Sequence, residues 1–197
     1  MYVRRKERGL SSAVIYGFQK AKYEILLVMD ADLQHNPIYI PDLIRPILDK
    51  RAEFVIGSRF VEGGAIVDWA VHRQLISKCA TLLAAPLASV SDPMSGFFCL
   101  TRTVLQRGLS RLNPVGYKIG LELLVRCRCY PVVEVPIVFQ DRVMGESKLT
   151  LKQNLLYLQH ILTLYRDYRP MVCVTVFRFP SSPTSAYVWV SISSNFT

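Results

Sequence analysis

Two aspartates stand one residue apart, at Asp30 and Asp32, directly after the apolar run of residues 24–29. Because side chains at i and i+2 point the same way on an extended backbone, both carboxylates can converge on one cation. The amide oxygen of Gln34 offers a third oxygen ligand, and such ligands suit Mg²⁺ or Mn²⁺. The pattern predicts a divalent metal site that holds a diphosphate. The alternative is that the two aspartates cap the following turn.

Basic residues at three further places are spaced to bind phosphate. Arg59 follows an apolar stretch, and a guanidinium can bind phosphate oxygens through two parallel hydrogen bonds. Arg73 and Ser77 are four residues apart, so on a helix they share one face and can hold one phosphate together. Arg142 and Lys148 flank a glycine, in a loop pattern that can stabilise a departing diphosphate. The alternative for each of these residues is an ordinary solvated charge.

Two more acidic residues stand in patterned segments. Asp92 lies in residues 91–98, which are typical of a turn before a strand. It can orient a sugar hydroxyl or an arginine partner, or it can simply close the turn ahead of Pro93. Glu122 lies on a predicted helix over residues 119–127, where we expect a charged side chain on the exposed face.

Strand ends and helix faces are needed to bring these residues together. Apolar runs predict strands over residues 24–29, 53–59 and 133–139, and another after residue 97. Helical periodicity predicts helices over residues 10–21, 40–48, 69–87 and 119–127, and one from residue 151 onward. Ser11 or Ser12 is expected to cap the first helix. Alternation of strands and helices indicates an α/β fold with a parallel sheet, whose ligands lie outside the carboxyl ends of the strands.

The last predicted helix carries an apolar stripe at Leu151, Leu155, Leu158, Leu162 and Tyr165. Most such stripes pack into a core, and the alternative is contact with a membrane surface. No stretch approaches the ~20 apolar residues that span a bilayer. The charged first residues lead into no apolar segment typical of a secretory leader. We therefore expect neither a spanning helix nor a leader.

Composition limits the class of partner. The chain has 197 residues, 51% of them hydrophobic and 20% charged, which is typical of one globular domain. Its net charge of +9 favours an anionic partner, such as a phosphate-rich substrate or a membrane surface. The sequence has no nucleic-acid-binding signature, so no nucleic acid partner is expected. The five cysteines lack metal-site spacing, and we expect reduced thiols on a cytosolic side.

Four segments, in order, resemble the dolichyl-phosphate mannosyltransferase family of inverting glycosyltransferases with the GT-A fold: residues 28–37, 72–77, 91–98 and 141–148. The resemblance covers about residues 3 to 169. It implies an α/β, GT-A (Rossmann-like) mixed sheet flanked by helices, N-terminally incomplete because two strand-helix units of the family do not precede the metal motif. It also implies a partial catalytic domain over residues 1–169 and a divergent tail over residues 170–197 without a transmembrane helix. An incomplete domain is expected to be a poor catalyst.

In this family, mannose moves from GDP-mannose to dolichyl or polyprenyl phosphate with inversion. The resemblance implies metal ligands at Asp30, Asp32 and Gln34, with Mg²⁺ or Mn²⁺ as the cofactor. It implies catalytic roles for Asp32, Arg142 and Lys148. It implies substrate contacts from Asp30, Arg59, Arg73, Ser77 and Asp92.

Two alternatives to this function stay open. One is a polyprenyl-phosphate glucosyltransferase that uses UDP-glucose, and the other is a non-catalytic fragment that binds a partner or a membrane. The family resemblance also implies a location at the cytosolic face of the endoplasmic reticulum membrane in a eukaryote. It implies peripheral contact with the membrane surface, and it allows small membrane subunits as partners.

Overall fold

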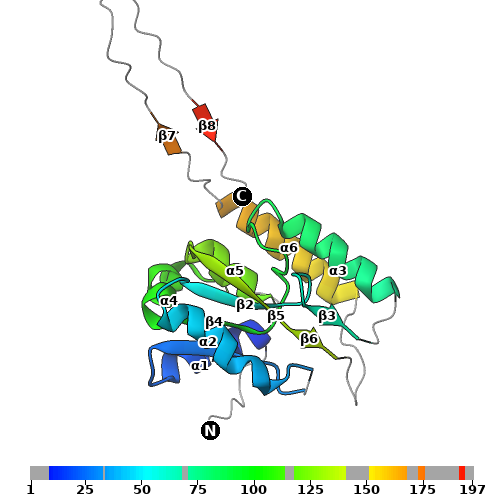
Figure 1. Ribbon diagram of the computed structural model, residues 1–197. Helices are drawn as coiled ribbons and strands as arrows, with labels where there is room; N and C mark the ends of the chain where they lie inside the picture. The colour runs from blue at the N-terminus through cyan, green and yellow to red at the C-terminus, as the bar shows by residue number, and fades with distance from the viewer. Residues whose placement is uncertain are drawn as a thin grey trace, which may run out of the picture.

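A computed structural model describes residues 9–32, 34–67, 71–113, 118–140, 151–167, 173–175 and 191–193. Side chains are described for the same ranges except residues 71–73, 151–152, 173–175 and 191–193. The described chain forms a central sheet with helices on both faces, and a further pair of helices, α3 and α6, lies beside it (Figure 1). This is the predicted α/β architecture.

The central sheet has the strand order β1-β4-β2-β5. Its strands are β1 (Ile25–Val28), β2 (Phe54–Ser58), β4 (Phe98–Thr101) and β5 (Val132–Pro136). Strand β4 pairs antiparallel with β1 and with β2, whereas β5 pairs parallel with β2. The predicted mixed sheet is therefore confirmed. The fully parallel sheet that the alternation of strands and helices indicates is wrong, because β4 runs antiparallel to both of its neighbours.

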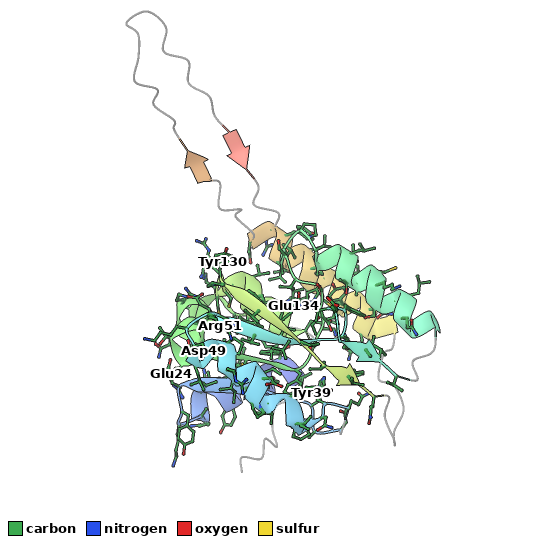
Figure 2. The ribbon with its side chains drawn as sticks, viewed as in Figure 1. Glu24, Tyr39, Asp49, Arg51, Tyr130 and Glu134 are labelled. Carbon is green, nitrogen blue, oxygen red and sulfur yellow. The ribbon has the colours of Figure 1, made fainter. Side chains whose placement is uncertain are left out.

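Strands β1, β2 and β5 run in one direction, so their carboxyl ends lie at the same end of the sheet. Strand β4 begins there, because it runs the opposite way. Glu24 and Tyr130, which precede β1 and β5, lie at the opposite end, and Tyr39 lies towards the carboxyl ends (Figure 2).

The α-helices are α1 (Leu10–Lys20), α2 (Ile40–Leu48), α3 (Val71–Ala84), α4 (Arg102–Gly108), α5 (Ile119–Arg126) and α6 (Leu151–Asp167). Short 3-10 helices are η1 (Pro37–Tyr39) and η2 (Leu109–Arg111). All five predicted helices are thus confirmed. The predicted serine cap of α1 is wrong: Gly9 is the N-cap residue and provides no side-chain cap, while Ser11 and Ser12 lie inside the first turn.

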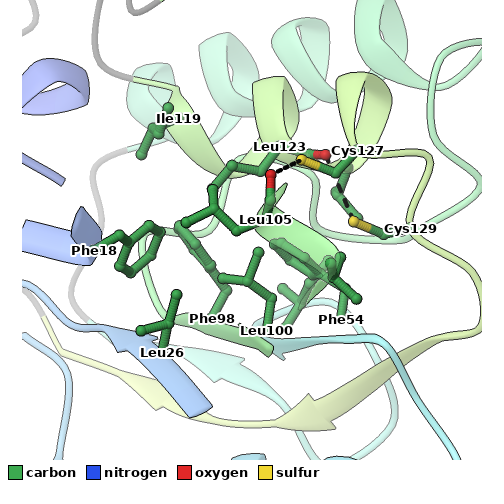
Figure 3. Close-up of a cluster of buried hydrophobic side chains, with 13 residues drawn as sticks. Phe18, Leu26, Phe54, Phe98, Leu100, Leu105, Ile119, Leu123, Cys127 and Cys129 are labelled. Carbon is green, nitrogen blue, oxygen red and sulfur yellow. Dashed lines mark hydrogen bonds between the residues drawn. The ribbon is translucent and has the colours of Figure 1, made fainter. Parts of the chain in front are cut away.

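Helices cover both faces of the sheet because successive strand side chains point to opposite faces. On one face, Phe54 and Phe98 stack at 5.2 Å between ring centroids and pack with Phe18 of α1 and with α4 and α5 (Figure 3). On the other face, Val55 and Cys99 pack with α2. Burial of these side chains fixes the sheet, and with it the positions of the strand ends.

The predicted strand over residues 133–139 is two strands. β5 ends at Pro136, and β6 (Val138–Phe139) pairs in parallel with β3 (Ala65–Ile66) in a separate two-stranded sheet. Ile137 between them donates its backbone N–H to the Ser58 carbonyl at 2.9 Å and buries its side chain. The alternating apolar pattern continues across this break, so the pattern alone does not reveal it.

Helix α6 does not bury the predicted apolar stripe. The side chains of Leu155, Leu158, Leu162 and Tyr165 are 67%, 44%, 69% and 38% exposed. The buried face of the helix instead carries Tyr157, His160, Ile161 and Leu164. The core interpretation of the stripe is therefore wrong. None of the helices in the described part of the chain is long and apolar enough to cross a membrane.

The described thiols at Cys79, Cys99, Cys127 and Cys129 are free, as expected. In the C-terminal part, β7 (Cys173–Thr175) pairs antiparallel with β8 (Ser191–Ser193).

Candidate active site

The candidate active site lies where the carboxyl ends of β1 and β2 meet the start of β4. Asp30 follows β1 by two residues, and Arg59 directly follows β2. Residues 91–97 lead into β4 at the same end of the sheet. Chain segments far apart in sequence are thus brought together by strand direction, in the position where open sheets bind ligands.

Arg59 and Asp92 form a buried, bidentate ion pair. Nε and Nη2 of Arg59 each donate to a different oxygen of the Asp92 carboxylate at 2.7 Å. The backbone N–H of Arg59 donates to the same carboxylate at 3.1 Å. Arg59 is 8% exposed and Asp92 is 0% exposed. The prediction that Asp92 holds an arginine partner is confirmed, while its predicted contact with a sugar hydroxyl stays a prediction.

The ion pair limits how Arg59 can bind a phosphate. Two of its nitrogens are bound to Asp92, and its guanidinium lies 5.2 Å from the Phe60 ring centroid and 5.3 Å from that of Phe139. Any acceptor phosphate must therefore bind while Asp92 holds the guanidinium in place. The substrate role of Arg59 stays a prediction.

The metal motif occupies the turn after β1. The backbone N–H of Gln34 donates to Oδ1 of Asp32 at 3.3 Å, so the turn-capping alternative is correct for Asp32. A carboxylate has about four acceptor positions, so this bond leaves the metal role open. Gln34 is 6% exposed, and its Nε2 donates to the Gln140 carbonyl at 3.2 Å. That bond orients the amide group.

The donor set fits a hard divalent cation. Asp30, Asp32 and Gln34 supply only oxygen ligands, and the Asp30 side chain is 40% exposed. The described residues contain no cluster of three or more His, Cys, Asp or Glu side chains suited to a metal. Two carboxylates with one amide suit a cation such as Mg²⁺ that keeps waters and binds substrate phosphates.

His35 also belongs to this site, although no pattern in the sequence distinguishes it. It is 4% exposed, between the rings of Phe97 and Phe139, with centroids 5.1 Å away in each case. Its Nδ1 accepts the backbone N–H of Asp30 at 3.3 Å. Burial lowers the pKa of His35 to about 4, although the Asp32 charge opposes the shift. A neutral imidazole thus fixes the backbone at Asp30.

The turn of residues 91–96 is held from two neighbouring strands. The carboxylate of Glu134 on β5 accepts the backbone N–H groups of Ser91 and Asp92 at 2.8 and 3.0 Å. The Ser95 hydroxyl donates to the Gly57 carbonyl of β2 at 2.7 Å. These bonds fix the loop that supplies the partner of Arg59.

Glu122 corrects another expectation, because it is 1% exposed rather than on a solvated face. Its two oxygens lie 2.6 Å from Arg126 Nε and 2.5 Å from His160 Nε2. The backbone N–H of Asn113 donates to it at 2.7 Å. Arg126 also pairs with Asp167 at 2.9 Å. This network joins α5 to α6, away from the strand ends.

The remaining candidates are placed only in part. Ser77 lies on α3 and is partly buried; Arg73 lies on the same helix, but its side chain is outside the described residues. Arg142 and Lys148 fall in residues 141–150, which are also outside the described residues. The roles of these four residues stay predictions.

A cavity of about 300 Å³ opens beside the metal motif, lined by Gln34, His35, Asn36, Pro37, Tyr39, Val138 and Gln140.

Comparison with known proteins identifies similar chains. A family model described as Glycosyl transferase family 2 matches residues 1–109. A Dolichol-phosphate mannosyltransferase of Pyrococcus furiosus is 47% identical over 167 residues, covering 83% of this chain and 47% of the relative. The enzyme of the same name in Mycosarcoma maydis is 41% identical over 190 residues, covering 95% and 64%. That of Saccharomyces cerevisiae is 44% identical over 170 residues, covering 83% and 63%. The chain thus spans about half to just under two thirds of the length of these curated relatives.

Solved structures share the fold at lower identity. Glucosyl-3-phosphoglycerate synthase from Mycobacterium tuberculosis, in complex with Mn²⁺ and UDP-glucose, matches with a TM-score of 0.55 at 19% identity, covering 91% of this chain and 61% of that one. Its complex with phosphoglyceric acid matches with a TM-score of 0.54 at 18% identity, covering 98% and 65%. This likeness confirms the predicted fold class.

Proposed function

The chain belongs to glycosyl transferase family 2, and on that premise we propose that it transfers mannose from GDP-mannose to the phosphate of dolichol or a similar polyprenol, with inversion. Relatives that are 41% to 47% identical bear the name Dolichol-phosphate mannosyltransferase. The observation that carries the proposal is that Asp30, Asp32 and the Arg59–Asp92 pair all lie at the same end of the sheet.

Asp30, Asp32 and Gln34 would hold Mg²⁺ or Mn²⁺ on the diphosphate of the donor. The bound cation would neutralise charge that builds up on the departing GDP. Gln34 is oriented for this by its bond to the Gln140 carbonyl, and Asp30 by the bond from its backbone to His35. Arg142 and Lys148 are proposed to stabilise the same leaving group from residues 141–150.

The acceptor phosphate needs alignment more than activation. A lipid phosphate is already ionised near neutral pH, so it can attack the sugar carbon without a strong general base. His35 is not suited to be that base, because its Nδ1 accepts the Asp30 N–H and its side chain is buried. Arg59, held by Asp92, would align the phosphate with Arg73 and Ser77 of α3.

The exposed apolar side chains of α3 and α6 support contact with a membrane surface. Leu75, Ile76, Leu82 and Leu83 of α3 are between 42% and 72% exposed, as are several leucines of α6. The two helices lie side by side, and Tyr157 and Tyr165 of α6 donate to carbonyls of α3 at 2.6 and 2.8 Å (Figure 1). An apolar surface of this kind can lie on a bilayer that holds the lipid acceptor.

We further propose a location at the cytosolic face of the endoplasmic reticulum membrane in a eukaryotic cell, with small membrane subunits as candidate partners. The phosphate-binding helix α3 would then face the bilayer.

A transfer assay tests the function. The 197-residue chain is incubated with a short polyprenyl phosphate, Mn²⁺, and either GDP-mannose or UDP-glucose. We expect mannosyl transfer at a low rate, because the chain spans only 47% to 64% of the length of its relatives. This transfer should be lost on chelation and in Asp32→Asn, and retained in the exposed control Asp49→Asn. Transfer from UDP-glucose alone, or transfer from GDP-mannose that survives both chelation and Asp32→Asn, would contradict the proposal.

A further inference from the structure

A lysine that the proposed mechanism does not use lies beside the candidate site. Lys118 directly precedes α5, and its Nζ donates to the backbone carbonyl of Met94 at 2.9 Å. Burial, with the nearby Arg59 charge, lowers the pKa of Lys118 to about 8, while the charges of Asp92 and Asp30 oppose the shift. The side chain of Lys118 thus reaches the turn that leads into β4.

Met94 lies in the middle of the turn of residues 91–96, and each end of this turn contacts a site residue. At its start, Asp92 holds Arg59 through the bidentate ion pair. At its end, Gly96 packs so closely on Asp30 that a Cβ at this glycine would lie 2.9 Å from Oδ2 of the carboxylate. A shift of the turn would therefore displace the groups that hold the side chains of Asp30 and Arg59 in place.

We propose that Lys118 is a positioning residue that sets the geometry of the metal-binding carboxylate Asp30 by holding the turn of residues 91–96. The bond to the Met94 carbonyl fixes the middle of the turn, so that Gly96 supports Asp30 and Asp92 holds Arg59. The metal part of the inference rests on the proposed function, because it takes Asp30 to be a metal ligand. The anchoring part does not.

A simple charge effect gives the opposite sign from a positioning effect. A positive charge near Asp30 repels a cation, so its removal by itself would strengthen binding of Mn²⁺. Loss of an anchor displaces the carboxylate and weakens binding, because partners that orient metal ligands typically contribute about 10-fold or more to metal affinity. The direction of the change in Mn²⁺ affinity therefore distinguishes the two.

The first measurement is Mn²⁺ binding to the whole chain by electron paramagnetic resonance, without nucleotide. We expect Lys118→Met to weaken binding roughly 10-fold. Lys118→Arg, which keeps the charge and the donor, should recover part of the loss. Lys20→Met, at the exposed C-terminus of α1, serves as the matched control and should bind Mn²⁺ as the wild type does.

A double-mutant cycle tests the route from Lys118 to Asp30. Gly96→Ala disturbs Asp30 from the other end of the turn, because the added Cβ would lie 2.9 Å from Oδ2 of its carboxylate. If both changes act through the turn, the double variant loses less affinity than the product of the two single losses. Independent, multiplicative losses would contradict this route.

Hydrogen exchange tests the anchoring without a metal. In Lys118→Met, we expect faster exchange at the backbone N–H of Asp92 and of Phe97, whose acceptors lie in or against the turn, and no change at Val104 of α4. If Lys118→Met does not fold, Lys118→Gln takes its place, since its side chain is one bond shorter and uncharged and should weaken the bond to the Met94 carbonyl.

Unchanged exchange, or an Mn²⁺ affinity that stays the same or rises in a folded variant, would overturn the inference. A wild-type chain that binds no Mn²⁺ would instead contradict the proposed function and the metal part of the inference together. The exchange measurement would still decide whether Lys118 anchors the turn.

Discussion

Two buried groups of charges differ in what surrounds them. The Arg59–Asp92 pair joins a strand end to the turn of residues 91–96, beside Asp30. The Glu122 network joins α5 to α6 through Arg126 and His160. Both contain buried, oppositely charged side chains in contact, so burial of charge does not by itself mark a catalytic site. The position at the carboxyl ends of the strands is what distinguishes the first group.

If this difference holds, apolar side chains in place of the Arg59–Asp92 pair should preserve the stability of the fold but abolish mannosyl transfer. Arg59→Met leaves a buried, unpaired carboxylate, and we expect the free energy of unfolding to fall by about 3–5 kcal/mol. Urea denaturation measures the loss. The double variant Arg59→Met with Asp92→Leu should recover most of the stability, since apolar side chains remove the unpaired charge. It should still fail in mannosyl transfer, and full transfer activity in that variant would contradict the role given to Arg59.

The two faces of α6 give the second prediction. Leu164 is 0% exposed and Leu162 is 69% exposed. Leu164→Ala should lower the free energy of unfolding by about 2–5 kcal/mol through lost burial and a cavity. Leu162→Ser should change it by less than about 0.5 kcal/mol, as exposed substitutions do. Thermal or urea unfolding checks both. Co-sedimentation with anionic phospholipid vesicles should drop only for Leu162→Ser, and equal sedimentation of the two variants would argue against membrane contact by this face.

The Glu122 network is expected to contribute to stability and not to ligand binding. Glu122→Gln keeps the shape of the side chain but removes its charge from His160 and Arg126. Hydrogen bonds to charged groups contribute about 1.5–3 kcal/mol, so we expect the free energy of unfolding to fall by that amount. Binding of Mn²⁺ and GDP should not change in the folded variant, as calorimetry can determine. A selective loss of nucleotide binding at unchanged stability would place Glu122 in the site.

The smallest expected effect is a difference in alkylation rate between two thiols. Cys79 is exposed on α3, whereas burial raises the pKa of the Cys99 thiol to about 12. Because the thiolate is the reactive form, we expect iodoacetamide to modify Cys79 at least roughly 10-fold faster than Cys99 at neutral pH. Peptide mass mapping of the folded chain checks this. Similar rates would mean that the face of the sheet covered by α2 opens readily.

The sequence was sufficient where local spacing determines geometry. The carboxylates of Asp30 and Asp32 follow a strand because an apolar run ends there, and Arg59 follows another for the same reason. The turn pattern around Asp92 predicts an arginine partner correctly. That this partner is Arg59 depends on β4 lying between β1 and β2. Strand order is a property of the whole sheet, and spacing along the chain does not encode it.

Other features depend on contacts between distant segments. The role of Lys118 cannot be predicted from the sequence, because its hydrogen-bond acceptor is the backbone carbonyl of Met94, which any residue type would offer. Glu122 and Arg126 have the spacing of an ordinary surface pair, and only packing of α6 brings His160 to them. Helix α6 has leucines on both faces, so periodicity could not determine which face is buried.

The carboxylates after β1 are proposed to bind a divalent cation together with a nucleoside diphosphate. Isothermal titration of the chain with GDP, in Mn²⁺ and in chelator, tests this claim most directly. We predict binding that requires Mn²⁺, is lost in Asp32→Asn, and is unchanged in Asp49→Asn, an exposed aspartate paired with Arg51. Equal GDP affinity in Mn²⁺, in chelator and in Asp32→Asn would contradict the claim.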